Sequence, residues 1–236
     1  MYDYKQLIFT NYHHTTIPLH KMNSFDKFAY TYQKYNLIQK KIIKKYLPFV
    51  KNRIIDLGCG SEGLCKYKDF EFYLGIDKSE NMLKFNPCNV IKADFNTKEC
   101  FELIKKYEFD QIVSFSALQW AEDLDFVFNE IKSLNNEFLL TIFTSNTFKT
   151  LHKFLDFTSP IYSKEEIINK SKILNPYIEI LNYTLTFSNP LDLLLYIKNS
   201  GVSGNKMCNY VKLRKFIKEF PFNYLEFEVV LLMNLI

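Results

Sequence analysis

The sequence predicts an α/β fold with a doubly wound, mostly parallel sheet. Five short apolar segments alternate with helical segments over residues 53–144, which is typical of parallel sheets covered by helices. Two later strand-like segments, at 177–187 and 225–235, flank further helices and indicate an antiparallel addition. No repeat, low-complexity tract or linker interrupts the sequence. We therefore expect one domain over residues 22–236, preceded by an unmatched leader over residues 1–21.

The first expected element is an N-terminal helix over residues 22–46. Apolar side chains recur there every three or four positions, which is the period of a helix with one buried face. Ser24 or Asn23 suits its N-cap, and Pro48 lies just beyond its end. Because the residues before this helix lack any such period, we treat Met22 as a candidate start of the natural protein.

Five strand-and-helix units follow the first helix. The strands are short apolar runs, and we expect them at 53–60, 72–77, 89–95, 109–115 and 137–144. Helical segments are expected at 79–85, 97–107, 123–134, 148–157 and 164–171. Together with the two late strands, this order predicts a seven-stranded sheet with a late antiparallel strand.

Charge is distributed unevenly along the chain. The net charge is +4, which is too small to argue for a nucleic-acid partner. Residues 1–50 carry +6 and residues 198–236 carry +3, so residues 51–197 carry −5. Two basic ends therefore flank an acidic middle.

The cysteines and the hydropathy pattern both point to a cytoplasmic protein. The five cysteines form no CxxC pair and show no metal-ligand spacing, so we expect reduced thiols and no metal site. No segment holds about 18 uninterrupted apolar residues, and the N-terminus lacks the order of a signal peptide. The sequence therefore predicts no membrane association.

The segment IIDLGCGSEG carries the most information about function. A strand that ends in Gly-x-Gly turns tightly and lets a nucleotide approach the backbone at the start of the next helix. Gly58, Gly60 and Gly63 spell GxGxxG, and Asp77 follows Gly58 by 19 residues. That spacing matches a dinucleotide site whose acid holds a ribose, so an NAD-dependent oxidoreductase is one interpretation.

Asp56 favours a different cofactor. It lies two residues before the first glycine, where a carboxylate would repel a pyrophosphate. A carboxylate at this place suits a cofactor that carries an amino group and a sulfonium. The string DLGCG resembles the first motif of class I S-adenosylmethionine-dependent methyltransferases, which implies a Rossmann-like fold and S-adenosylmethionine as methyl donor.

The same resemblance assigns roles to acids at later strand ends. Asp77 falls where that family places its ribose-binding acid, and Asp94 and Phe95 fall where it places an adenine N6 acceptor and an adjacent backbone donor. The alternative is that Asp77 and Asp94 cap helices. The cofactor-binding residues that the resemblance implies are Asp56, Gly58, Cys59, Gly60, Asp77, Lys78, Met82, Asp94, Phe95, Ser114 and Phe115.

The glycine turn departs from the family at one position. The third glycine of the family usually stands where this chain has Glu62, and the glycine here is one residue later, at Gly63. A glutamate at positive φ would be strained, so we expect a locally altered turn. This departure leaves the cofactor affinity open, and with it the alternative of a scaffold without activity.

Several segments resemble the malonyl-acyl-carrier-protein O-methyltransferases of biotin synthesis, from about Ser24 to the C-terminus. These segments are SFDKFAYTYQKYNLIQKK, SFSALQWAEDL, TIFTSNTFKTLHKF, NSGVSGNK and FPFNYLEFEVV. The pair Gln119-Trp120 is shared with methyltransferases of small carboxylates such as trans-aconitate, which is the alternative within the enzyme class. The Lys-Pro-Gly-Gly turn of the family is absent, because Ser133–Asn136 stands in its place.

The resemblance implies methyl transfer to a carboxylate oxygen. That oxygen is ionised at pH 7, so no general base is required and orientation supplies most of the catalysis. By similarity, Ser114 and Phe115 line the methionine end of the cofactor, and Gln119 and Trp120 form a wall nearby. Tyr32 is a candidate cation–π partner of the sulfonium. Ordinary core packing is the alternative role for Tyr32 and for Trp120.

The substrate of this family requires two sets of cationic groups. A substrate carboxylate needs a cation or several donors, and the candidates are Arg214, Lys206, Lys149, His152 and Lys153. Acyl carrier proteins are acidic, so the basic ends of the chain offer a docking surface for malonyl-acyl carrier protein. The first helix adds a cationic edge, formed by Lys40, Lys41, Lys44 and Lys45. A solvated face in a lysine-rich sequence is the alternative.

Overall fold

The computed structural model of the chain describes residues 34–200, 216 and 219–234. The leader, Tyr32 and most of the first half of the expected N-terminal helix lie outside these residues, as do Lys206 and Arg214. Among the helices of the described part, none is both long and apolar enough to cross a bilayer.

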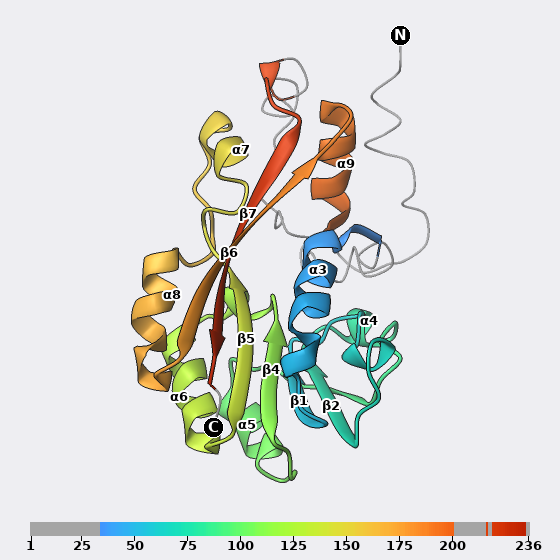
Figure 1. Cartoon of the computed structure of the whole chain (residues 1–236), viewed down its shortest axis with the longest axis vertical. Coiled ribbons are helices and arrows are strands. Elements are labelled where there is room, and N and C mark those ends of the chain that lie inside the picture. The colour runs from blue at the N-terminus through green and yellow to red at the C-terminus, as the bar shows by residue number, and fades with distance from the viewer. Residues whose placement is uncertain (1–33, 201–215, 217–218, 235–236) are drawn as a thin grey trace, which may run out of the picture.

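The described strands form one seven-stranded sheet in the order β3-β2-β1-β4-β5-β7-β6 (Figure 1). Strands β1 to β5 pair in parallel, whereas β7 runs antiparallel to both β5 and β6. The predicted mostly parallel, doubly wound sheet with a late antiparallel strand is therefore confirmed.

The boundaries of the elements lie close to those expected. The strands are β1 Arg53–Leu57, β2 Phe72–Asp77, β3 Val90–Lys92, β4 Gln111–Phe115, β5 Glu137–Phe143, β6 Tyr177–Thr186 and β7 Tyr224–Met233. The α-helices of the described part are α3 Leu37–Tyr46, α4 Glu80–Leu83, α5 Lys98–Ile104, α6 Leu124–Leu134, α7 Lys149–Phe154, α8 Lys164–Ser171 and α9 Pro190–Ser200. Short 3₁₀ turns lie at Leu47–Phe49, Leu64–Lys66, Leu118–Trp120 and Lys172–Leu174.

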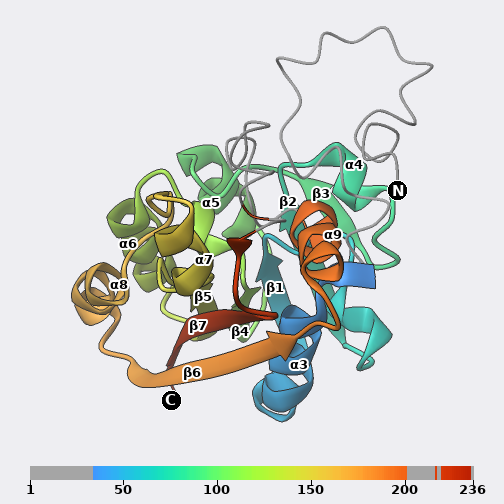
Figure 2. The same ribbon diagram turned by 90° about the horizontal axis from the view of Figure 1, so that it is seen from above.

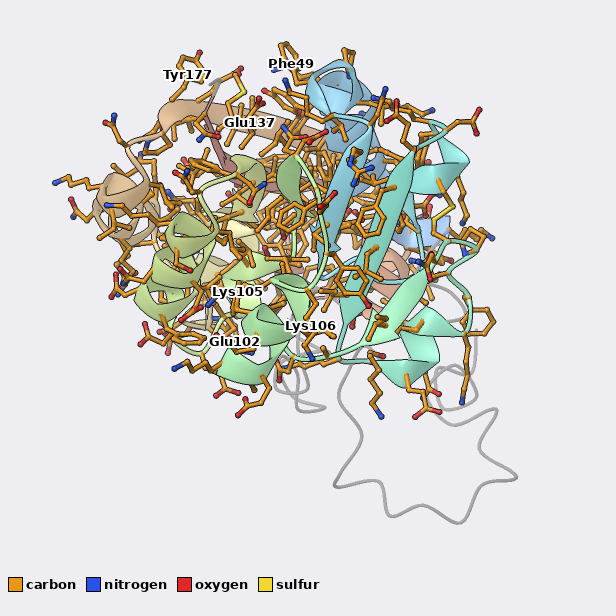
Figure 3. The ribbon with its side chains drawn as sticks, turned by 90° about the horizontal axis from the view of Figure 1, so that it is seen from below. Phe49, Glu102, Lys105, Lys106, Glu137 and Tyr177 are labelled. Carbon is orange, nitrogen blue, oxygen red and sulfur yellow. A yellow bond between two sulfur atoms is a disulfide. The ribbon has the colours of Figure 1, made fainter. Side chains whose placement is uncertain are left out.

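Alternate residues of the central strands enter two separate apolar cores, because successive side chains of a strand point to opposite faces. Ile54 and Val113 join the core beneath α3 and α9, whereas Ile55 and Ile112 join the core beneath α5 and α6. Figure 2 shows α3 and α9 on one side of the sheet and α5, α6 and α8 on the other. Figure 3 views the amino ends of the parallel strands, where Lys51 pairs with Glu137 at 2.9 Å.

The N-terminal helix is not continuous in its described part, contrary to the prediction. Residues 34 and 35 are helical, Asn36 leaves helical geometry with φ −84° and ψ 47°, and α3 begins at Leu37. The buried amide of Asn36 donates a hydrogen bond to Glu62 at 3.0 Å. Asparagine readily takes such a bond in place of helix interior geometry, so the interruption ties the start of α3 to the turn after β1.

The glycine turn leads into a 3₁₀ turn at Leu64–Lys66 and not into an α-helix. The expectation of a helix start beside the cofactor is therefore wrong. The segment between β1 and β2 instead folds back on itself, with the Tyr67 hydroxyl donating to Glu62 at 2.6 Å.

Two of the five cysteines form a disulfide, which corrects the expectation of reduced thiols throughout. Cys65 and Cys88 are joined, with their Cα atoms 5.8 Å apart, whereas Cys59 and Cys100 are free and buried. The disulfide holds the 3₁₀ turn after the glycines against the loop between α4 and β3. Spacing alone does not reveal which cysteines meet in space.

Candidate cofactor site at the carboxyl edge of the sheet

The chain leaves β1 and β4 toward opposite edges of the sheet, so their carboxyl ends form its topological switch point. Ligands of open α/β sheets bind at this place. A pocket lies there between the start of α3, the turn after β1 and the end of β4, and we call it the glycine-turn pocket. Its lining residues are Asn36, Gln39, Ile43, Asp56, Gly58, Cys59, Gly60, Glu62, Gly63, Leu64, Phe115 and Ser116.

The backbone of the turn explains its three glycines. Gly58, Gly60 and Gly63 all have positive φ, at 71°, 54° and 60°, a region that other residues rarely adopt. A Cβ atom on Gly58 would lie 2.1 Å from the Cβ of Ala117. The expected local alteration of the turn is confirmed, because Gly63 takes the positive φ and Glu62 does not.

Asp56 is the carboxylate at the floor of the pocket. It is 3% exposed and accepts a hydrogen bond of 2.8 Å from the Tyr73 hydroxyl. Burial raises the pKa of Asp56 to about 7, the nearby Asp77 adds to the rise, and the Tyr73 bond partly offsets it. Burial also raises the pKa of the neighbouring Cys59 thiol, together with the charges of Asp56 and Asp77, so this thiol is protonated and not a nucleophile at neutral pH.

Asp77 connects the glycine turn to the end of β2. Its carboxylate accepts hydrogen bonds from the Gly60 amide at 2.9 Å and from the Ser79 amide at 2.8 Å. The N-cap of α4 is Ser79, whose hydroxyl accepts from Met82. Asp77 is therefore not the cap of that helix.

Asp94 stands at the end of β3 in a similar position. Its Oδ1 accepts from the amide of Asn96 at 3.0 Å, and its Oδ2 lies 3.7 Å from Lys78 Nζ. The N-cap of α5 is Thr97, so Asp94 does not cap that helix either. Phe95 is buried beside Gly58, with its ring 3.6 Å from a Cβ built there.

Other predicted residues divide between the pocket and its surroundings. Met82 is buried and lies 3.9 Å from a Cβ built on Gly60, so it borders the turn. Phe115 lines the pocket directly. Ser114 is fully buried and its hydroxyl donates to the Leu57 carbonyl at 2.7 Å, which joins β4 to β1. Its role in the structure is thus to hold the two strand ends together.

Gln119 and Trp120 do not line the glycine-turn pocket. Gln119 is buried and donates to the Ser116 carbonyl at 2.6 Å. Both residues line a separate, more open hollow beside the segment before α8, together with Ala121, Glu122, Pro160, Ile161, Tyr162 and Glu166. The structure therefore does not place these two residues on this pocket, although the Ser116 carbonyl that accepts from Gln119 belongs to a residue of its lining.

Four polar lining residues were missed by the sequence reasoning, namely Asn36, Gln39, Glu62 and Ser116. These residues are between 1% and 8% exposed. The sequence contained one usable signal for them, since a polar residue at Asn36 interrupts the apolar period of the first helix. Ser116 has φ 63°, and nothing in its sequence context predicts that.

The lining fits the methionine end of S-adenosylmethionine. Buried oxygens of Asn36, Gln39 and Ser116 have no hydrogen-bond partner among the described residues, and Asp56 and Glu62 add two carboxyl groups. Buried acceptors without donors are costly, so they favour a ligand that brings N–H donors and positive charge. An aminoacyl chain with an ammonium group and a sulfonium has both.

Comparison with known proteins decides the class of the domain. Residues 55–135 match a family described as a methyltransferase domain. This chain carries a methyltransferase domain. The match begins within β1 and ends just after α6, so it contains the glycine turn, Asp77, Asp94 and the end of β4. The three-glycine pattern is thus that of a methyltransferase and not of an oxidoreductase.

Similarity to known methyltransferases extends over most of the chain. A malonyl-[acyl-carrier protein] O-methyltransferase of Haemophilus influenzae is 24% identical over 214 residues, which is 86% of this chain and 82% of that protein. A solved putative methyltransferase of antibiotic biosynthesis from Anabaena variabilis has a TM-score of 0.59 at 14% identity, covering 87% of this chain and 99% of the other. A SAM-dependent methyltransferase from Archaeoglobus fulgidus has a TM-score of 0.50 at 17% identity, covering 85% and 96%.

The domain match and the shared fold confirm the predicted enzyme class, a class I methyltransferase with S-adenosylmethionine as its cofactor. The solved neighbours share the fold of this chain at low identity. A shared fold and cofactor do not identify the methyl acceptor.

Proposed function

We propose that the chain methylates the free carboxylate of malonyl carried by acyl carrier protein, with S-adenosylmethionine as methyl donor. The observation that carries this proposal is the similarity to the Haemophilus influenzae malonyl-[acyl-carrier protein] O-methyltransferase, which extends over 86% of this chain. That similarity reaches well beyond the methyltransferase domain match at residues 55–135, and so includes segments outside the cofactor motif.

Different residues at the carboxyl edge of the sheet bind different parts of the cofactor. Asp56, Glu62 and the backbone of the glycine turn hold the methionine end, Asp77 holds the ribose, and Asp94 with Phe95 holds the adenine. When bound, S-adenosylmethionine supplies an electrophilic methyl group on a sulfonium. Ile43, Leu64 and Phe115 are the large apolar members of the lining, and they limit the access of water to this end of the site.

A carboxylate acceptor agrees with the chemistry of the pocket residues. The titratable side chains of the lining are Asp56, Cys59 and Glu62. Burial keeps the Cys59 thiol protonated, and the buried Asp56 carboxyl is already bonded to the Tyr73 hydroxyl. A malonyl carboxylate is ionised at neutral pH and needs no base. The task of the chain is therefore to orient two bound partners in a dry site.

The candidates for binding the substrate carboxylate are narrowed by the structure. His152 packs against Phe148 and Phe157, and burial lowers its pKa, so it is neutral at pH 7 and a poor partner for an anion. Lys149 and Lys153 are exposed on α7 and keep their charge accessible. We assign the carboxylate to these lysines or to the candidates Lys206 and Arg214, which lie outside the described residues.

The acceptor is tested by the mass of the methylated product. We expect incubation with S-adenosylmethionine to add one methyl group, 14 Da, to malonyl-acyl carrier protein, and the same ester to form more slowly on malonyl-CoA. Methylation of trans-aconitate with no product from either malonyl thioester would replace this proposal by a small-carboxylate methyltransferase.

The cofactor is tested independently of the acceptor. We expect S-adenosylhomocysteine to raise the melting temperature of the protein and NAD to leave it unchanged, because ligands that bind the folded state stabilise it. A shift with NAD alone would contradict the assignment of the glycine turn.

A further inference from the structure

We propose that Glu62, together with Asn36 and Gln39, forms a subsite that selects the α-ammonium group of the cofactor. The inference rests on the proposed binding of S-adenosylmethionine and deepens it. It assigns a ligand role to the one residue of the glycine turn that departs from the pattern of the family, and to two residues of the helix that precedes β1.

The subsite consists of hydrogen-bond acceptors. Asn36 Oδ1 and Gln39 Oε1 are buried and have no partner among the described residues. The orientation of Asn36 is fixed, because its Nδ2 donates to Glu62 Oε2 at 3.0 Å and its oxygen is left for another donor. Ser116 Oγ, also buried and without a partner in the described part, lines the same pocket. An ammonium group brings three donors.

Glu62 retains capacity for a ligand after its contacts inside the protein. Its Oε1 accepts from the Tyr67 hydroxyl at 2.6 Å and its Oε2 from Asn36 at 3.0 Å. Each carboxylate oxygen can accept a second hydrogen bond. Lys40 Nζ forms an ion pair with Oε2 at 3.7 Å from outside the pocket lining. This distance is beyond that of a hydrogen bond, so the pair offsets part of the charge of Glu62 without occupying its remaining lone pairs. Glu62 therefore presents carboxylate acceptors to the pocket.

The turn after β1 lacks the feature that would favour an anion instead. An α-helix starting there would aim free N–H groups and the positive end of its dipole at the ligand. This chain has only a 3₁₀ turn of three residues, Leu64–Lys66. No lysine, arginine or histidine lines the pocket in the described part. The lining consequently favours the amino group of the methionine end over its carboxylate.

A purely structural role for Glu62 predicts a different result. The bonds from Asn36 and Tyr67 fasten α3 and the 3₁₀ turn to the glycine turn, and this fastening alone would support every ligand of the site equally. A subsite for the ammonium group supports only ligands that carry it. The two roles are separated by comparing cofactor analogues, not by the loss of affinity alone.

The test is calorimetric binding of three probes. They are S-adenosylhomocysteine, its decarboxylated analogue, which keeps the amine, and its deaminated analogue, which keeps the carboxylate. We expect the wild-type protein to bind the deaminated analogue at least about tenfold more weakly than the decarboxylated one, because a charge-assisted hydrogen bond is lost. Glu62→Gln, which preserves size, should reduce this ratio severalfold. Glu71→Gln removes the same charge at an exposed site before β2 and should leave the ratio unchanged.

Each outcome decides between the roles. A reduced ratio in Glu62→Gln with a normal ratio in Glu71→Gln supports the subsite. Equal weakening of all three probes by Glu62→Gln, with a lower melting temperature, overturns it in favour of fastening. Equal binding of the two analogues by the wild-type protein also overturns it, and this measurement needs no variant. Failure of S-adenosylhomocysteine to bind at all would instead refute the assignment of the cofactor.

Discussion

Asp56 is a buried carboxyl group that exchanges its proton near neutral pH, because burial raises its pKa to about 7. In the free protein, this shift stabilises the folded state at acid pH, and the contribution is lost as the pH rises through about 7. A cation placed beside Asp56 favours the ionised form and lowers its pKa. Cofactor binding should therefore release a proton around neutral pH.

The first prediction concerns this proton. We expect the affinity for S-adenosylhomocysteine to rise about tenfold between pH 6 and pH 8, in step with the ionised fraction of a group of pKa near 7. Calorimetry in two buffers of different ionisation enthalpy should detect the released proton. Asp56→Asn should bind more weakly and show a flat pH profile. A sloping profile in Asp56→Asn would assign the proton to another group.

Asp77 carries the second prediction. Asp77→Ala removes the acceptor of the Gly60 and Ser79 amide bonds as well as the proposed ribose contact, so we expect S-adenosylhomocysteine to bind at least about tenfold more weakly. The matched control is Asp69→Ala, which replaces an exposed aspartate in the connection between β1 and β2. This variant should bind S-adenosylhomocysteine with the affinity of the wild type. Unchanged affinity in Asp77→Ala would refute the ribose role.

At the scale of elements, the strands were predictable and the connections were not. The apolar runs at 72–77 and 109–115 gave β2 and β4 almost to the residue, because a buried parallel strand must be apolar throughout. The crossover after β1 was missed because a 3₁₀ turn and a disulfide are decided by contacts between distant residues. The break at Asn36 has the same origin, since its partner Glu62 is 26 residues away.

For the cofactor site as well, the residues at strand ends were predictable from the sequence and the loop residues were not. Asp56, the glycines and Phe115 meet in one pocket, since they lie at or just after the carboxyl ends of the adjacent parallel strands β1 and β4. Gln119 and Trp120 were expected near the methionine end, whereas in the structure they line a separate hollow beside the segment before α8. Position along the chain predicts which strand end a residue follows, whereas the direction of a side chain in a loop depends on tertiary contacts.

The disulfide between Cys65 and Cys88 carries the third prediction. It closes a loop with a sequence separation of 23, and the chain-entropy model assigns about 3 kcal/mol of stability to a loop of that length. We expect reduction by dithiothreitol to lower the free energy of unfolding in urea by about that amount. The affinity for S-adenosylhomocysteine should fall as well, because Asn86 in the cross-linked loop holds the Gly60 carbonyl at 2.8 Å.

A double variant provides the control for the disulfide. Cys65→Ser with Cys88→Ser should match the reduced wild type in both measurements and should not respond further to dithiothreitol, although it retains the free Cys59 and Cys100. A response to dithiothreitol in the double variant, or none in the wild type, would show that the cross-link does not support the turn.

At the scale of the whole molecule, some of the basic side chains of α3 already form ion pairs within the protein. Among the four lysines of α3, Lys40 lies 3.7 Å from Glu62 and Lys45 pairs with Glu179 at 3.0 Å. Lys41 and Lys44 are exposed and form no ion pair with other described residues. The cationic edge available to an acidic partner is thus narrower than the sequence suggests, and it consists of these two lysines.

Lys41 and Lys44 therefore carry the last prediction. We expect Lys41→Glu with Lys44→Glu to lower kcat/KM for malonyl-acyl carrier protein about fivefold or more, because charge reversal opposes docking of an acidic protein. The loss should shrink as salt is raised, since exposed charges are screened. A small malonyl thioester of N-acetylcysteamine, which has no carrier protein, should react at an unchanged rate.

A second charge reversal separates docking from net charge. Lys105 and Lys106 are exposed in the turn directly after α5 (Figure 3), and α5 lies on the opposite face of the sheet from α3. Lys105 also pairs with Glu102 at 2.8 Å, but an exposed pair of this kind contributes little stability. Lys105→Glu with Lys106→Glu changes the net charge equally and should leave turnover of the carrier-protein substrate unaffected. Equal losses in both double variants would mean that the carrier protein responds to the overall charge of the molecule, and not to a docking surface on α3.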